Sequence, residues 1–456
     1  MSERVAYSPG RAARFYVPLL LQAFSQSLTY PLVGAIISHG ADGVDGLTAF
    51  SLGQVIMFMI GALGGGLIMT GMVFAKTREG LASFRRLNTL MMMVLLTIQM
   101  FVCIHPIDTF FFERLLNLSP HLAEIARRTT FFGVVMQAAF FLRNVPLVLL
   151  FNAYASFEAN LATAARIALT FAFTLTFPRM GWVGPDWGLF ALTVPVVLEW
   201  LLSEVFAAKY ERRLVGGATD GVLAQFKFTM PLSIGSCLLA VSPFMTAAFV
   251  GRAANPTDML AIHYVTLGIA NPVSFAALRM QAVSIQFPPE WPGDRRLLRF
   301  ALVVGLLLGI IPLVFATPLI GGWYYGGCQN IPPRILGTTR FVSFLYSFIC
   351  VIHAVRGRVE GLAAIRKRPS AVMAGQVGYF VALVIVLALT LPLGIPGWAM
   401  AVIAIYVAPV AATAATYAGL GRGGKENRDV AGGNGIIRGV GEERIHATED
   451  LKDGCR

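Results

Sequence analysis

Twelve long apolar stretches are the feature that most restricts the fold of this 456-residue chain. A helix of about 20 apolar residues crosses a bilayer, and lipid-exposed backbone must satisfy its own hydrogen bonds. We therefore predict an all-α integral membrane protein with about 12 transmembrane helices. The predicted spans are 14–38, 47–74, 88–107, 129–151, 158–178, 187–208, 226–250, 259–285, 299–320, 339–361, 371–391 and 397–418.

The charges agree with a membrane protein. Only 13% of the residues are charged, about half of the roughly 25% that is typical of a soluble domain. The net charge is +12, but the basic residues lie in loops between the spans, so membrane topology explains them better than nucleic-acid binding does. Loops rich and poor in Lys and Arg alternate, which predicts a multi-pass protein of the cell membrane, plasma or inner, with both termini cytoplasmic.

An internal repeat divides the chain. FYVPL from Phe15 recurs as FTMPL from Phe228, 213 residues later, and Arg143 maps onto Arg356 at the same offset. We predict two pseudo-symmetric six-helix bundles around a central cavity, an arrangement in which the halves of a carrier rock about a site between them. A duplicated fold with no transport role is the alternative. The expected units are residues 1–213, residues 214–420 and a disordered cytoplasmic tail at 421–456.

Polar side chains form a stripe along one face of the first span. Gln22 and Gln26 lie one turn apart, so they share one face of the helix. One interpretation is a cavity wall that contacts substrate. The other is hydrogen bonding between helices, which polar side chains in membranes often provide. The sequence leaves both open.

Ionisable groups in the fourth and tenth spans are stronger candidates. Arg143 and Asn144 lie in the fourth span, and His353, Arg356 and Glu360 lie in the tenth. A charge at mid-bilayer costs about 2.5–3.5 kcal/mol on insertion scales, so such groups rarely face lipid. The two arginines are predicted to present two cations to one anionic substrate, with Asn144 and His353 beside them. Alternatively, Arg356 pairs with Glu360 one turn away, and Arg143 extends toward the membrane surface or caps a backbone carbonyl.

Glu199 is the candidate ion-coupling residue, for H⁺ or Na⁺. Glu204, Arg166 and Arg279 are further charges within spans, without an assigned role. No Walker sequence, HExxH or GxSxG motif occurs, and the five cysteines form no CxxC pair. We therefore predict neither an enzyme nor a cofactor or metal site.

Several stretches resemble a known family. They are VPL after Phe15, GMVFAKTRE from Gly71, NPVSFAALRMQ from Asn271, VRGRVEGLAAIRKRPS from Val355 and LPLGIPGWAM from Leu391. With the two halves, they resemble the multidrug/oligosaccharidyl-lipid/polysaccharide exporters, and within them the progressive ankylosis family. The resemblance implies two bundles around a cavity and export of small anions such as pyrophosphate, citrate or nucleotide. It provides no motif from which catalytic residues carry over.

The leading hypothesis is a secondary transporter that exports a small organic or phosphate-containing anion by alternating access. Drug-exporting members usually carry an acidic residue in the first span, where this chain has glutamines. A multidrug or lipid-linked saccharide flippase is the alternative within transport. A non-transporting membrane scaffold, which needs no central cavity, is the alternative outside it.

Overall fold

The computed structural model describes residues 7–115, 118–218, 220–289, 294–329 and 331–433. Within these ranges all regular structure is helical. Eleven segments are long and apolar enough to cross a membrane, and α1 (Pro9–Ser38), with 30 residues, coincides with the remaining predicted span. The protein is therefore a multi-pass, all-helical membrane protein, as the apolar stretches predicted.

In the first half of the chain, six further helices come after α1. Prolines occupy the first positions of α5 and α7, where the missing N–H has no partner to lose. At the start of α4, the Thr77 side chain accepts a hydrogen bond from the Gly80 N–H. These helices are α2 (Gly43–Ala62), α3 (Leu67–Phe74), α4 (Arg78–Val102), α5 (Pro120–Asn152), α6 (Ser156–Thr176) and α7 (Pro185–Glu211).

The second half repeats this order with more interruptions. Three expected single spans are each divided into two helices: α9 ends and α10 begins around Arg279, α11 and α12 are separated by Thr317, and α13 and α14 are separated near Ser347. The helices are α8 (Gly221–Val250), α9 (Pro256–Leu278), α10 (Met280–Gln286), α11 (Arg296–Ala316), α12 (Pro318–Gly321), α13 (Pro333–Tyr346), α14 (Ile349–Ile365), α15 (Pro369–Thr390) and α16 (Gly397–Gly433).

The last helix is longer than expected. It continues to Gly433, whereas the predicted tail was to begin at residue 421. The rest of that tail, residues 434–456, lies outside the described residues.

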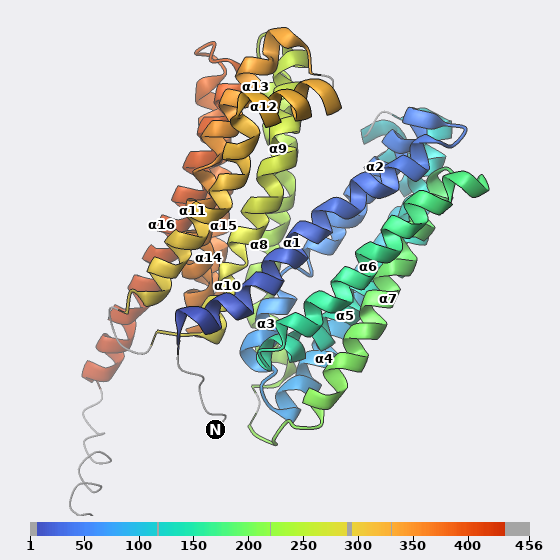
Figure 1. Cartoon of the computed structure of the whole chain (residues 1–456). Coiled ribbons are helices and arrows are strands. Elements are labelled where there is room, and N and C mark those ends of the chain that lie inside the picture. Colours follow the sequence, from blue (N-terminus) through green and yellow to red (C-terminus); the bar gives the residue numbers. More distant parts are fainter. Residues whose placement is uncertain (1–6, 116–117, 219, 290–293, 330, 434–456) are drawn as a thin grey trace, which may run out of the picture.

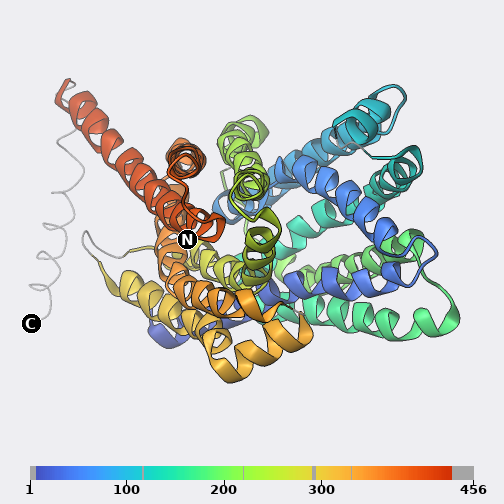
Figure 2. The ribbon, with the colours of Figure 1, turned by 90° about the horizontal axis from the view of Figure 1, so that it is seen from above.

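Two bundles result. In Figure 1, α2 and α4–α7 lie on one side, α11 and α13–α16 lie on the other, and α1 runs beside α6. Seen from above, the two groups of helices lie next to each other (Figure 2). Large apolar side chains such as Val94, Phe101, Leu306 and Leu307 are exposed on the outer helices, as expected where the solvent is lipid.

The halves meet at the end of the molecule that carries α3 and α10, and they diverge toward α13 (Figure 1). The Tyr16 hydroxyl donates to the Ala276 carbonyl at 2.8 Å, and Gln286 Nε2 donates to the Phe151 carbonyl at 2.6 Å. Each bond joins the first half to the second. This end of the interface is therefore held by buried polar contacts.

Glycines make close approach possible at this junction. The chain turns at Gly64, Gly65 and Gly66 between α2 and α3. A Cβ at Gly65 would lie 2.5 Å from Oγ of Ser236, on α8 of the other half. The GxxxG spacing of Gly61 and Gly65 thus marks close packing, as such spacing usually does.

Candidate functional site

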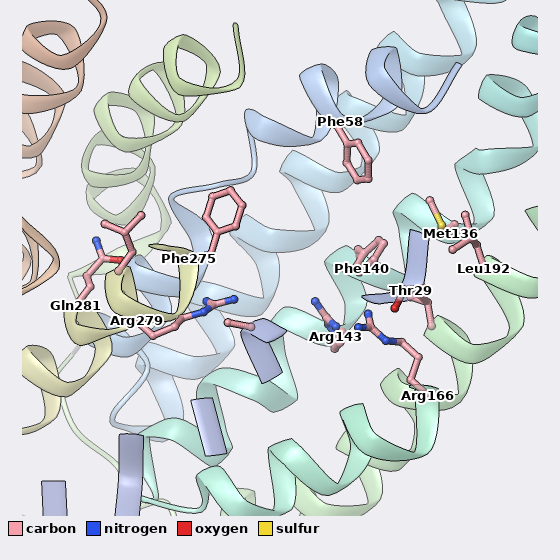
Figure 3. Close-up of a pocket in the computed structure, with 13 residues that line it drawn as sticks. Thr29, Phe58, Met136, Phe140, Arg143, Arg166, Leu192, Phe275, Arg279 and Gln281 are labelled. Carbon is pink, nitrogen blue, oxygen red and sulfur yellow. The ribbon is translucent and has the colours of Figure 1, made fainter. Parts of the chain in front are cut away.

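A cavity of about 660 Å³ lies between the two bundles. Its walls come from α1, α2, α5, α6 and α7 of the first half, and from α9, α10 and the residue between them in the second (Figure 3). Its size is typical of a site for a small molecule. The lining residues are Ala23, Thr29, Phe58, Met136, Phe140, Arg143, Arg166, Leu192, Val196, Phe275, Leu278, Arg279 and Gln281.

Three arginines supply the charge of this lining. Arg143 comes from α5, Arg166 from α6 and Arg279 from the break between α9 and α10. Figure 3 shows the Arg279 side chain extending from the second half toward Arg143 and Arg166 in the first. Arg143 is 8% exposed, and its guanidinium lies over the ring of Phe140, 4.9 Å from the centroid. No carboxylate is among the lining residues that the structure describes.

Glu199 of α7 lies behind these arginines and is completely buried. Its Oε2 accepts from Arg143 Nη1 at 2.5 Å and lies 3.3 Å from Arg166 Nη1. Its Oε1 accepts from the Thr163 hydroxyl at 2.5 Å, and Gln22 Nε2 donates to that hydroxyl at 3.2 Å. One carboxylate thus fixes side chains from several helices in place.

The charges of this cluster do not balance. Among the described residues, Arg143, Arg166, Arg279 and Glu199 together carry a net charge of +2. Removing a charge from water is expensive unless partners compensate for it, and the effective penalty is several kcal/mol per ion. An anion of one or two charges in the cavity would supply that compensation. A cation would meet repulsion.

The structure brings some predicted site residues together and separates others. Arg143, Glu199 and Gln22 belong to one network, in which Gln22 acts through a hydrogen bond between helices. Asn144 instead donates to Oδ1 of Asn88 at 3.1 Å and is not among the cavity-lining residues. The side chain of Gln26 lies outside the described residues.

Arg356 and His353 line a second cavity, of about 170 Å³, in the C-terminal half. Arg356 Nε donates to Glu360 Oε1 at 2.8 Å, which is the local pairing left open above. The expected presentation of Arg143 and Arg356 to one substrate is therefore not what the structure shows. The two arginines occupy equivalent helices of the repeat, but each lines a different cavity.

Sequence reasoning assigned no role to Arg166 or Arg279. The signal was present, because both are cations inside predicted spans. The sequence did not show which way these two side chains point. Arg279 lies at the one-residue junction between α9 and α10, and its side chain lines the cavity.

No protein-family model and no curated protein matches the sequence. Solved structures do match the fold, at low sequence identity. One is a transporter of the MOP superfamily from Pyrococcus furiosus, described as having a binding pocket of reverse polarity that suggests a different function (TM-score 0.64, 15% identity, 91% of this chain and 95% of that one).

Two further matches are MATE transporters. The eukaryotic AtDTX14 matches with a TM-score of 0.62 and 13% identity over 89% of this chain and 94% of its own. A mutant of VcmN from Vibrio cholerae matches with a TM-score of 0.66 and 14% identity over 90% of this chain and 97% of its own. The chain therefore has the MATE-type fold of two six-helix bundles.

Proposed function

We propose that this chain, with the fold of the MATE transporters, is a secondary transporter that exports a small organic or phosphate-containing anion by alternating access. The observation that carries the proposal is the cavity between the halves, with Arg143, Arg166 and Arg279 in its lining and no carboxylate there among the described residues. Arginine charge is permanent, and the guanidinium fork binds carboxylate or phosphate bidentately. The net charge of +2 suits a substrate with two negative charges.

The site also suits a carrier whose two halves move relative to each other during transport. Arg143 and Arg166 belong to the first half, as does Glu199, which pairs with both. Arg279 belongs to the second half. A bound dianion would contact cations of both halves at once. Such a ligand stabilises one relative arrangement of the halves by its differential affinity for it.

The alternative functions are less well supported. A multidrug exporter of cations would place its substrate against three guanidinium groups. A scaffold requires no cavity at all between the bundles, and the structure contains one with a charged lining. A flippase for lipid-linked saccharide phosphates stays the nearest competitor, because its headgroup is also an anion.

Ion coupling through Glu199 is a separate part of the proposal. Na⁺ at this carboxylate would lie beside two guanidinium groups, so Na⁺ is disfavoured there. The same guanidinium groups oppose protonation of Glu199, but a proton needs no coordination sphere, and once bound it would leave Arg143 and Arg166 for a substrate carboxylate or phosphate. We therefore favour H⁺ over Na⁺ as a coupling ion.

Membership of the progressive ankylosis family, a cell-membrane location and cytoplasmic termini belong to the proposal as well. Labelling single cysteines introduced at Gly10 and at Gly43 with an impermeant thiol reagent tests the orientation. Only the cysteine at Gly43 should react in intact cells.

Anion flux in proteoliposomes tests the function. Labelled citrate and pyrophosphate are loaded inside, and their release is followed for the wild type and for Arg143→Gln, Arg166→Gln and Arg279→Gln. We expect each cavity variant to reduce flux at least tenfold. Arg128→Gln, on the same helix as Arg143 but in an exposed pair with Asp186, should keep wild-type flux.

The outcomes separate the hypotheses. Equal flux in the wild type and all three cavity variants would refute the anion site. Efflux of a quaternary ammonium dye without any anion flux would favour the multidrug alternative. Movement of a fluorescent lipid phosphate across the bilayer, without citrate or pyrophosphate release, would favour the flippase.

A further inference from the structure

The smaller cavity in the C-terminal half has no part in the proposed organic-anion site. It has a volume of about 170 Å³ and lies between α8, α9, α13, α14, α15 and α16. His263 of α9, Tyr346 of α13, and His353 and Arg356 of α14 line it, as does Tyr379 of α15. These side chains come from four helices, so only the packed bundle brings them together.

Two imidazole nitrogens in this lining are buried without a hydrogen-bond partner among the described residues. They are Nδ1 of His263 and Nδ1 of His353. The two residues are only 2% and 9% exposed. Buried polar groups in folded proteins are nearly always hydrogen-bonded, so two such groups on residues that line one cavity point to a bound partner, either ordered water or an anion.

The chemistry of the lining selects an anion. An imidazole and a phenol can each donate a hydrogen, and so can the Arg356 guanidinium, whose positive charge is paired with Glu360 through Nε. No carboxylate lines the cavity in the described part of the chain. A metal ion would be repelled by Arg356, and the described residues contain no group of three His, Cys, Asp or Glu side chains suited to hold one.

The size of the cavity limits the anion. At about 30 Å³ per water molecule, 170 Å³ corresponds to roughly five or six waters. A hydrated chloride or one orthophosphate fits this space, whereas a nucleotide does not. The central cavity is about 660 Å³ and has room for larger organic anions.

We propose that this cavity is a second anion site, which binds one small inorganic anion between His263, His353, Tyr346 and Arg356. The anion accepts hydrogen bonds from the imidazoles and the phenol and interacts with the guanidinium. Phe275 and Leu278 line both cavities, so the bound anion lies against a shared wall of the central cavity. The proposal does not depend on which substrate the central cavity carries.

Binding to the purified full-length protein tests the site. Labelled chloride, and in a separate series labelled orthophosphate, is measured by equilibrium dialysis in gluconate buffer. We expect saturable binding of at least one of them, weakened at least tenfold by His263→Phe and by His353→Phe, which fill the same space without a donor. His39→Phe, at an exposed position, is the matched control and should bind as the wild type does.

Arg356→Gln alone leaves Glu360 buried without its partner and can fail to fold. The double variant Arg356→Gln/Glu360→Gln removes both charges and should also bind at least tenfold more weakly. Arg143→Gln distinguishes binding at the two cavities, because it removes a cation from the larger one only. Small-anion binding should persist in it even where citrate flux is lost.

Two results would overturn the proposal. One is the absence of saturable binding of either anion to the wild-type protein. The other is binding that both histidine variants retain and that Arg143→Gln abolishes, which would place the small anion in the central cavity. Citrate or pyrophosphate flux is measured independently, so failure of the transport proposal would be distinguishable from failure of this one.

Discussion

Replacing Glu199 by Gln tests the charge balance of the central cavity most directly. The substitution keeps the size of the side chain but removes the only carboxylate that pairs with Arg143 and Arg166 in the described structure. The net charge of the cluster then rises from +2 to +3. The amide oxygen can still accept a hydrogen bond from Arg143 or Arg166, but it carries no negative charge to compensate them.

The expected loss of stability is large. Breaking a buried ion pair by removing one partner costs about 3–5 kcal/mol, because the other charge is left uncompensated. Here the negative charge that pairs with Arg143 at 2.5 Å and with Arg166 at 3.3 Å is lost. We therefore expect a destabilisation of about 3–5 kcal/mol in the absence of an anion.

A bound anion should restore part of this loss. A ligand at 100 times its Kd stabilises the folded state by about 2.7 kcal/mol. Since the variant has the larger excess of positive charge, citrate or pyrophosphate should raise its unfolding midpoint more than that of the wild type.

Thermal unfolding in detergent, followed by tryptophan fluorescence, measures both effects. Glu204→Gln is the control on the same helix, because Glu204 accepts from Trp200 Nε1 at 3.3 Å and pairs with no cavity arginine in the described structure. It should unfold as the wild type does. If Glu199→Gln unfolds at the wild-type temperature without any anion, Glu199 is not the counter-ion of the two arginines and the reasoning fails.

Three further predictions concern the junction of the halves and the residues that lie off the cavity. Tyr16→Phe removes one hydrogen bond between the halves and Gln286→Ala removes two, each worth about 0.5–1.5 kcal/mol, so spin-label distances across that end should show a larger open population; distance distributions identical to those of the wild type would contradict this role. Gly65→Ala places a Cβ 2.5 Å from a side-chain oxygen of α8 and should lower stability by about 1–3 kcal/mol, whereas Gly268→Ala, with no atom within 4 Å, should not; equal unfolding midpoints would contradict the close packing. Asn144→Ala should leave citrate flux within about twofold of wild type, because its amide bonds to another helix and does not line the cavity; a tenfold loss would return it to the site.

The helical spans were predictable because hydropathy is a property of each segment alone. A 21-residue apolar segment such as α11 has no other way to satisfy its backbone in lipid. The ends were less predictable, since α5 begins at Pro120, nine residues before its expected start. Polar first turns extend the helices beyond the apolar core without changing the number of spans.

The candidate site was predictable only in part. Arg143 and Glu199 were selected because a charge inside a span requires a reason, and they proved to be partners. Gln22 was selected from its helical face, and its contact is a hydrogen bond to Thr163. The pairing of Arg143 with Arg356 was inferred from the repeat, yet a repeat relates positions by symmetry and does not make them neighbours.

The sequence by itself determined that the chain crosses the membrane as helices and that it buries cations where cations are expensive. These follow from transfer free energies that each residue has wherever it lies. The tertiary structure alone decided which cations share a cavity. Arg279 joins Arg143 and Arg166, and Arg356 stays with Glu360, because the packing of the helices sets the direction of each side chain.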